Sequence, residues 1–241
     1  MFKEISSVIS FLTVIPSKNS ELEVVAKNMY LFPIAGALIG LVIGGAGYGL
    51  SMFLQPLITG LILTGALAII TGIHHTDALC DFVDGIMAKG TKEKKLKAMR
   101  DPAVGSAGVM TVVLYAAGMI LAISMVKGFA LFEAILLSEL MAKLSMVIQA
   151  NRGLSAWEGL SSPFTQYMKN PKKLAAAGAL AITPTVILGG MTGVFLVISC
   201  IGLSFLLLTI AKRSFGGISG DVFGASNELV RLASLLIFAS V

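Results

Sequence analysis

Long apolar runs, separated by short polar segments, extend along almost the whole chain. A helix that crosses a lipid bilayer needs about 20 mostly apolar residues. Runs of this kind cover roughly residues 31–53, 57–75, 103–126, 129–150, 174–189, 191–210 and 221–240. The fifth and sixth runs are short and joined by Gly189 and Gly190, so they form either one long or broken helix or two separate spans. Two spans are preferred, because the stretch from 174 to 210 is too long for a single crossing. The pattern therefore predicts an all-α, polytopic membrane helix bundle with about seven transmembrane helices.

The composition supports a membrane protein with one domain. Hydrophobic residues make up 56% of the 241 residues and charged residues only 13%, whereas a soluble domain carries about a quarter charged residues. The sequence has no evident internal repeat or low-complexity linker, so residues 1–241 are interpreted as a single membrane-embedded domain. The two cysteines, Cys80 and Cys200, indicate neither a disulfide framework nor a CxxC metal site. We interpret both as small packing residues.

Basic residues are distributed unevenly between the two sides that seven spans define. With the N-terminus in the cytoplasm, only Lys127 lies in an outer loop, and Lys143 and Arg231 lie within spans. The other basic residues fall in cytoplasmic segments: Lys3, Lys18, Lys27, Lys89, Lys92, Lys94, Lys95, Lys97, Arg100, Arg152, Lys169, Lys172, Lys173, Lys212 and Arg213. This asymmetry follows the positive-inside rule. It predicts a multi-pass protein of the cell membrane, and it explains the net charge of +5 without a nucleic-acid partner.

Three aspartates follow the second predicted span, where the chain enters the cytoplasm. Asp77, Asp81 and Asp84 are spaced by four and three residues, with His75 just before them, so a helix would place the carboxylates on one narrow stripe. Like charges at this spacing repel one another, and no basic residue lies among them. A divalent cation resolves this conflict, and oxygen ligands favour Mg²⁺, Mn²⁺ or Ca²⁺. The alternative is an acidic first turn that complements a helix dipole, but it accounts for Asp77 better than for the later two.

A strongly basic segment, residues 89–102, follows the aspartates. It either provides charge that fixes the membrane topology or forms a basic wall for phosphate groups beside the metal. Arg100 and Asp101 directly precede a span that opens with Pro102, Gly105 and Gly108. Because glycine lets the backbone approach a ligand closely, Arg100 and Asp101 are candidate site residues.

A second polar constellation lies near the C-terminus, on the same predicted cytoplasmic side. A turn that contains Gly217 and Gly220 precedes a helix, and backbone N–H groups in such a turn can bind phosphate. Asp221 and Glu228 are seven residues apart, so they share one face of that helix. Acidic residues that enter a membrane span carry a high energetic cost, which argues for a function. The same constellation also contains Lys212, Arg213 and Asn227.

The fourth predicted span contains two opposite charges, Glu139 and Lys143, at i,i+4 spacing. They form either an intrahelical ion pair, which lowers the cost of burying each charge, or a contact with substrate. The cytoplasmic segment 158–160, Glu-Gly-Leu, is too short to indicate chemistry by itself.

With these motifs the chain resembles the cobalamin 5′-phosphate synthase family, also called adenosylcobinamide-GDP ribazoletransferases. The family pattern reads H-x-D-G-L-A-D-x-x-D-G, followed by a basic stretch that ends K-D-x-x-x-G-x-x-G. The matching residues here are His75, Asp77, Asp81, Asp84 and Gly85, then Arg100, Asp101, Gly105 and Gly108, with the segments 11–16, 158–160 and 216–228. The chain departs from the pattern at Ala78, Phe82 and Lys143, where relatives have a glycine, a smaller residue and often an arginine.

The resemblance implies an enzyme that joins adenosylcobinamide-GDP to α-ribazole or α-ribazole 5′-phosphate and releases GMP, with Mg²⁺ as cofactor and the site facing the cytoplasm. A sugar hydroxyl attacks a pyrophosphate, and metal held by carboxylates stabilises the charge that develops. On this hypothesis the catalytic residues are His75, Asp77, Asp81, Asp84 and Asp101. The substrate-binding residues are Arg100, Lys212, Arg213, Gly217, Gly220 and Asn227. The metal ligands are Asp77, Asp81, Asp84, Asp221 and Glu228. The sequence leaves open the oligomeric state and which residue takes the proton.

Two other classes of membrane protein share some of these features. A CDP-alcohol phosphotransferase motif begins like Asp81-x-x-Asp84-Gly85-x-x-Ala88, but Lys89 replaces its arginine and no further aspartate pair follows in register. A cation-coupled transporter would place charges near the bilayer midplane within two related halves. Most acidic residues here lie at the predicted cytoplasmic interface instead, and no repeat is evident.

Overall fold

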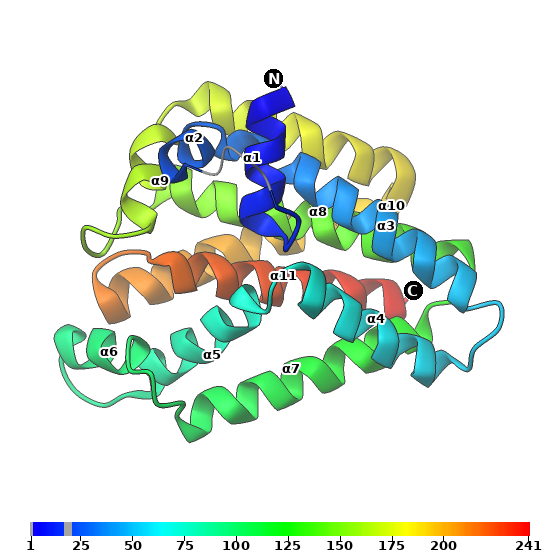
Figure 1. Cartoon of the computed structure of the whole chain (residues 1–241), viewed down its shortest axis with the longest axis horizontal. Helices are drawn as coiled ribbons and strands as arrows, with labels where there is room; N and C mark the ends of the chain where they lie inside the picture. Colours follow the sequence, from blue (N-terminus) through cyan, green and yellow to red (C-terminus); the bar gives the residue numbers. More distant parts are fainter. Residues whose placement is uncertain (1, 17–20) are drawn as a thin grey trace.

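Helices account for all regular secondary structure in the part of the chain that the structure describes, residues 2–16 and 21–241. The computed structural model contains α1 (Phe2–Leu12), α2 (Leu22–Lys27), η1 (Met29–Leu31), α3 (Phe32–Leu50), α4 (Pro56–Ile70), α5 (His74–Met87), α6 (Lys92–Met99), α7 (Ser106–Met125), α8 (Phe129–Arg152), α9 (Ser161–Tyr167), α10 (Pro171–Phe215) and α11 (Gly220–Ala239) (Figure 1). Lys18, which the charge pattern assigns to a cytoplasmic segment, lies outside these ranges.

Four stretches of helix are long and apolar enough to cross a membrane: Met29–Leu50, Ser106–Met125, Pro171–Phe215 and Gly220–Ala239. The pair α4 and α5 would add a fifth if it forms one bent span. These helices confirm the predicted all-α, polytopic bundle. The number of seven spans stays a prediction.

The predicted boundary between the fifth and sixth spans coincides with a break inside α10. Gly190 has φ 54° and ψ −129°, a non-helical conformation that is essentially restricted to glycine. A Cβ atom on Gly193 would lie 2.1 Å from the carbonyl oxygen of Thr185, although eight residues of straight helix would separate the two by about 12 Å. The chain therefore reverses at Gly190, and α10 is a hairpin of two helical arms.

The second predicted span, 57–75, is too long at its C-terminal end. α4 ends at Ile70, and α5 leaves at an angle of 89° to it. Gly72 and Ile73 have φ values of 67° and 64°, and the left-handed conformation cannot continue a right-handed helix. The carbonyl of Ile70 accepts a hydrogen bond from the amide of Val14, at 2.8 Å. The segment after α1 thus helps to end α4, and the bend sends α5 out at a new angle.

α8 lies at the centre of the bundle and packs against α3, α10 and α11. Every residue from 134 to 150 is buried. Gly36 of α3 permits the close approach, because a Cβ there would lie 2.6 Å from the carbonyl oxygen of Glu139. Small residues of this kind are typical of membrane helix interfaces. Since Glu139 and Lys143 lie within the buried stretch, other protein groups must compensate their charges.

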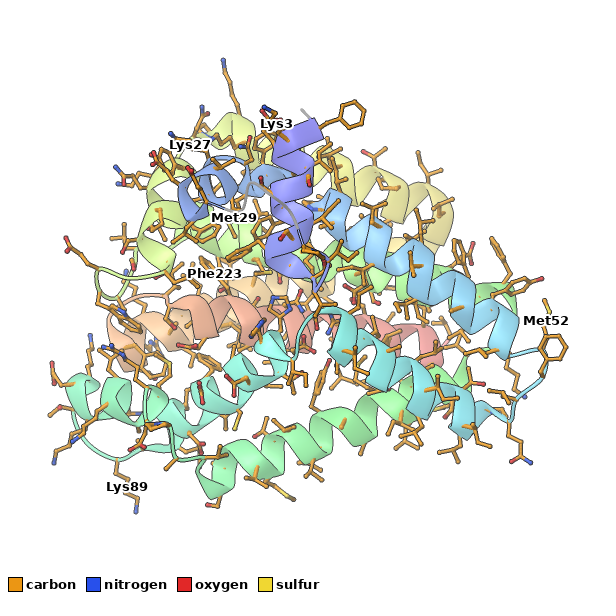
Figure 2. All side chains as sticks on the ribbon, in the orientation of Figure 1. Lys3, Lys27, Met29, Met52, Lys89 and Phe223 are labelled. Atoms are coloured by element: carbon orange, nitrogen blue, oxygen red, sulfur yellow. The ribbon has the colours of Figure 1, made fainter. Side chains whose placement is uncertain are left out.

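The outer surfaces of α3, α4, α7 and α10 expose large apolar side chains. Val42, Leu61, Leu114 and Ile187 are among them, at 58–74% exposure. Side chains of this kind suit contact with lipid. Figure 2 shows Lys27 and Lys89 toward the end of the bundle opposite Met52. This arrangement agrees with the predicted separation of basic segments from the outer loops.

Candidate functional site

The bend after α4 directs α5 across the N-terminal half of α11, where the two helices are in close contact. A Cβ on Gly224 of α11 would lie only 2.4 Å from the Cβ of Ala78. Ala78 is one of the positions at which the chain departs from the family pattern. Its methyl group therefore occupies the crossing point of the two helices, and the glycine of α11 makes room for it.

This crossing brings carboxylates from two helices together. Asp81 on α5 is close enough to interact electrostatically with Asp77, Asp84 and Asp221, and Asp221 belongs to the first turn of α11. Neither Asp77 nor Asp81 makes a side-chain hydrogen bond or ion pair with any described residue. The predicted stripe on α5 thus exists, and its first two carboxylates are free to bind a ligand.

Asp84, the third member of the stripe, has a different environment. Its Oδ2 accepts a hydrogen bond from the amide of Gly105 at 2.7 Å, and its Oδ1 accepts one from the amide of Gly108 at 2.8 Å. A Cβ on Gly105 would lie 2.4 Å from Oδ1 of Asp84, and one on Gly108 would lie 2.4 Å from Sγ of Cys80. Because these two glycines have no side chain, the carboxylate of Asp84 can lie against the N-terminus of α7. Its role as a metal ligand stays a prediction.

Asp221 lies opposite the stripe. Ser219 forms the N-cap of α11, since its Oγ accepts a hydrogen bond from the amide of Val222. The same hydroxyl group is 3.1 Å from Oδ2 of Asp221. Arg100 interacts electrostatically with Asp221 and stacks over the ring of Trp157 at 5.5 Å. Arg100 and Asp221, both predicted site residues, are thus close enough in the structure to interact electrostatically.

The glycine turn before α11 has a packing role that the sequence did not reveal. The amide of Ile218 donates to the carbonyl of Leu154, and the carbonyl of Ile218 accepts from the amide of Ala156, each at 2.9 Å. A Cβ on Gly217 would lie 2.5 Å from the carbonyl oxygen of Leu154. The amide of Ile218 is therefore already used within the protein, and the prediction that this turn offers amides to phosphate concerns its other residues. Gly217 as a substrate contact stays a prediction.

Lys212 and Arg213 border a different hollow from the one that Asp221 lines. With Lys92 and Arg152 they surround a cavity of about 810 Å³ that also reaches Gly217. Four basic side chains around one cavity form a favourable environment for an anion. Their contact with a nucleotide stays a prediction.

Asp101 lies at the edge of the site. Its Oδ1 accepts a hydrogen bond from the amide of Ala103, two residues later, which stabilises the turn that leads into α7. Nothing in the described residues connects its side chain to Asp77, Asp81 or Asp221. Its catalytic role stays a prediction.

The two charges of α8 belong to a buried network. The Nε of Arg231 forms a short ion pair with Glu139, and the Nζ of Lys143 lies 3.4 Å from the same carboxyl group. Arg231 also contacts both carboxyl oxygens of Glu228, at 2.7 and 2.6 Å, and Glu228 accepts a short hydrogen bond from Tyr115. Two acids thus compensate two bases, which lowers the cost of burying all four.

This network uses Glu228, one of the predicted metal ligands. The side chain is 1% exposed, and its two oxygens already bind Arg231, Tyr115 and Asn227. The sequence revealed Arg231 only as a charge within a span, and it did not reveal Tyr115. The i,i+3 spacing of Glu228 and Arg231 was the available signal. We therefore regard Glu228 primarily as a structural residue, and its role as a metal ligand stays a prediction.

Asn227 connects the network to His75. Its Oδ1 must face Lys143, whose ammonium group lies 2.6 Å away and only donates. The amide nitrogen of Asn227 therefore points the other way, 3.3 Å from Nδ1 of His75 and 2.9 Å from Oε1 of Glu228. Since Nδ1 accepts this hydrogen bond, the proton of the neutral imidazole lies on Nε2. The network thus fixes the tautomer of His75 and makes Nε2 a donor.

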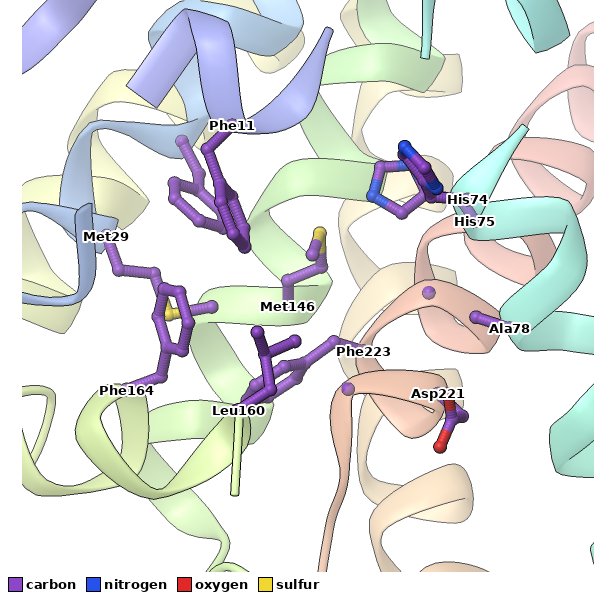
Figure 3. Close-up of a pocket in the computed structure, with 13 residues that line it drawn as sticks. Phe11, Met29, His74, His75, Ala78, Met146, Leu160, Phe164, Asp221 and Phe223 are labelled. Carbon is purple, nitrogen blue, oxygen red and sulfur yellow. The ribbon is translucent and has the colours of Figure 1, made fainter. Parts of the chain in front are cut away.

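His75 and Asp221 line a common cavity of about 280 Å³ (Figure 3). His74, Ala78, Gly220 and Gly224 line it on the same side, and aromatic and methionine side chains line the other. The cavity therefore has a polar wall beside the carboxylates and an apolar wall away from them.

The carboxylates suit a Mg²⁺ ion that the protein binds through only a few ligands. Among the described residues, no three His, Cys, Asp or Glu side chains already converge on one point. Mg²⁺ is usually bound by one or two carboxylates, with water and substrate phosphates completing the octahedron. Asp77, Asp81 and Asp221 meet that requirement, because they gather on two facing helices and the first two lack protein partners.

Sequence comparisons identify the relatives of this chain. The profile of the family described as cobalamin-5-phosphate synthase matches residues 4–239. A Methanocella arvoryzae protein named adenosylcobinamide-GDP ribazoletransferase is 31% identical, over 98% of this chain and 94% of its own. Proteins of the same name from Methanococcoides burtonii and Archaeoglobus fulgidus are each 33% identical, over 94% and 98% of this chain and 88% and 96% of theirs. No solved structure shows a significant match. This chain therefore belongs to the cobalamin-5-phosphate synthase family of transferases.

Proposed function

We propose that this protein joins adenosylcobinamide-GDP to α-ribazole or its 5′-phosphate and releases GMP, in an Mg²⁺-dependent phosphoryl transfer. The observation that carries the proposal is the meeting of Asp77 and Asp81 with Asp221 at the crossing of α5 and α11, beside a cavity that admits a small molecule. The relatives that match nearly the whole of this chain carry the name of that activity.

In this reaction the protein forms no covalent bond to the substrates, and it acts by positioning them and stabilising charge. A ribosyl hydroxyl oxygen bonds to the phosphorus attached to the cobinamide, and the bond from that phosphorus to the bridging oxygen of GMP breaks. Mg²⁺, when bound by Asp77, Asp81 and Asp221, would stabilise the negative charge on the transferring and leaving oxygens. Arg100 carries a permanent positive charge near Asp221, which suits a role in orienting the pyrophosphate.

The hydroxyl proton requires an acceptor. His75 is poorly suited, because its Nδ1 already accepts a hydrogen bond from Asn227 and its Nε2 carries a proton. Asp221 lines the same cavity and is ionisable, so we assign the proton to the carboxylate oxygen of Asp221 that would not bind the metal. His75 instead donates a hydrogen bond from Nε2 to a substrate oxygen. In this assignment the proton moves from the ribosyl hydroxyl to Asp221, and GMP leaves as an anion.

The site also has a proposed orientation. The acidic crossing lies near the basic helix α6 and the loop that contains Arg100. Because basic segments remain in the cytoplasm, we place the site on the cytoplasmic side of the cell membrane. Guanosine-containing substrates and Mg²⁺ would then reach it directly.

The test uses the full-length protein in lipid vesicles. Adenosylcobinamide-GDP and α-ribazole are supplied together or singly, with and without Mg²⁺, and GMP and the joined product are quantified. Equal amounts of GMP and product, only when both substrates and the metal are present, are the expected result. Release of CMP from a CDP-alcohol, or cation uptake without product, would overturn the proposal in favour of the phosphotransferase or the transporter.

A further inference from the structure

The volume of the cavity beside Asp221, about 280 Å³, is just below the usual range for ligand pockets, about 300–1,000 Å³. A corrinoid ring system is far too large to enter it. Its occupant must be a small molecule, or one small part of a large one, that brings a reacting group to Asp221.

The wall away from Asp221 is aromatic. Phe11 of α1, Phe32 of α3 and Phe164 of α9 form a cluster with ring centroids 5.5–6.1 Å apart, and Phe223 of α11 lies 6.0 Å from Phe164. All four rings line the cavity, together with Met29 and Met146 (Figure 3). Aromatic and thioether side chains favour a flat, apolar aromatic ligand over a sugar or a phosphate.

The opposite wall is polar and lacks bulk. Gly220 and Gly224, one helical turn apart on α11, present no side chain, and His75 and Asp221 flank them. A ligand with an aromatic head and a hydroxyl-bearing tail therefore matches the cavity along its length.

Two sequence segments without assigned chemistry converge on this cavity. Phe11 belongs to segment 11–16 and Leu160 to segment 158–160, and both side chains line the cavity although 149 residues separate them. A hydrogen bond of 2.7 Å from Tyr167 to Glu23 connects α9 to α2, next to Met29. The short helices α1, α2 and α9 thus together form or support the apolar wall of the cavity.

We propose that this cavity binds the acceptor substrate, a benzimidazole riboside, with the bicyclic base packed against the wall that Phe11, Phe164 and Phe223 form and the ribosyl hydroxyls toward Asp221. This inference rests on the proposed function, and it adds the location of the acceptor and the basis of its selection. The cavity size and the aromatic wall select the base, whereas the carboxylates beside the polar wall, outside the cavity except for Asp221, receive the donor. The corrinoid and the guanosine remain outside this cavity.

The test separates acceptor binding from donor binding. Phe11→Ala removes part of the aromatic wall, and Leu160→Trp fills the cavity from a half-exposed position. Phe2→Ala is the matched control, since Phe2 lies on the same helix but is 89% exposed. We expect Phe11→Ala to raise KM for the riboside about tenfold, the effect of one lost aromatic contact. Leu160→Trp should raise it by about the same factor because the indole takes up space that the base needs, and KM for adenosylcobinamide-GDP should be unchanged in both variants. An unchanged riboside KM, or an equal rise in both KM values, would overturn the inference.

Calorimetric titration of the riboside alone, without donor, keeps this test independent of turnover. Wild-type protein in nanodiscs should bind the riboside, and Leu160→Trp should bind it about tenfold more weakly. If the riboside binds in this way but no GMP is ever released, the proposed function fails and the cavity assignment stands. If transfer proceeds but both proteins bind the riboside equally, the cavity assignment fails and the function stands.

Discussion

The carboxylate of Asp84 accepts a hydrogen bond from the backbone amide of Gly108, 24 residues further along the chain, at 2.8 Å. With the second bond, from Gly105, both oxygens of Asp84 hold the N-terminus of α7 against α5. An aspartate of the predicted catalytic stripe thus holds in place the start of α7, the third predicted span.

This relationship separates Asp84 from Asp81 experimentally. Asp84→Asn places an amide N–H against a backbone N–H, so we expect a loss of about 1–3 kcal/mol in the free energy of unfolding. The Mg²⁺ concentration for half-maximal activity should stay near the wild-type value. Thermal unfolding in detergent and Mg²⁺ titration of activity measure the two effects. A large rise in the Mg²⁺ requirement, with stability retained, would show instead that Asp84 is a metal ligand.

Ala78 and Gly224 provide a prediction about helix packing. A methyl group on residue 224 would lie 2.4 Å from the Cβ of Ala78, so Gly224→Ala should separate α5 from α11 and cost about 1–3 kcal/mol of stability. Adding Ala78→Gly removes the clashing methyl group and should restore much of the stability and activity. Equal losses in the single and the double variant would contradict this account of the crossing.

The buried network predicts a large effect of removing one charge. Arg231→Met leaves Glu139 and Glu228 without their guanidinium partner, and loss of one member of a buried pair costs about 3–5 kcal/mol. Arg213→Met, on an exposed arginine, is the control and should leave unfolding almost unchanged. Adding Glu228→Gln to Arg231→Met should recover part of the loss. Similar unfolding of both arginine variants would show that the network contributes little.

Gly190 predicts a cost that arises from backbone conformation alone. A Cβ at this position would meet no atom within 4 Å, but φ is 54° with ψ −129°. Gly190→Ala should therefore lower the free energy of unfolding by about 1–3 kcal/mol through strain and not through a clash. Gly202, helical and equally open, is the control, and Gly202→Ala should not destabilise. If Gly190→Ala were equally harmless, the reversal at Gly190 would need another explanation.

Local pattern predicted much of this structure. The apolar runs gave the α3, α7, α8 and α11 helices, and the glycine pair at 189–190 marked the reversal in α10. The spacing of Asp77, Asp81 and Asp84 gave the stripe on α5, because helical periodicity depends only on neighbours along the chain.

The features that could not be predicted from the sequence depend on contacts between residues that are far apart in the chain. Nothing local to Asp84 indicates that it binds the amides of Gly105 and Gly108, and nothing local to Phe11 and Leu160 indicates a shared cavity. The end of α4 depends on a left-handed Ile73, which a β-branched residue adopts only where the surroundings require it. The amide of Ile218 donates to the carbonyl of Leu154, and the sequence of the turn around Ile218 does not indicate that the loop containing Leu154 lies beside it.

The central claim is that Asp77, Asp81 and Asp221 hold the metal at which the transfer occurs. The most direct measurement is the Mg²⁺ dependence of GMP release by the wild-type protein and by Asp81→Asn, both inserted in vesicles and shown by thermal unfolding to be folded. We expect wild-type release to require Mg²⁺ and the variant to lose at least about a hundredfold in rate at saturating metal, since metal stabilisation of the transition state contributes several kcal/mol. Near-native release by Asp81→Asn at the same Mg²⁺ concentration would contradict the claim.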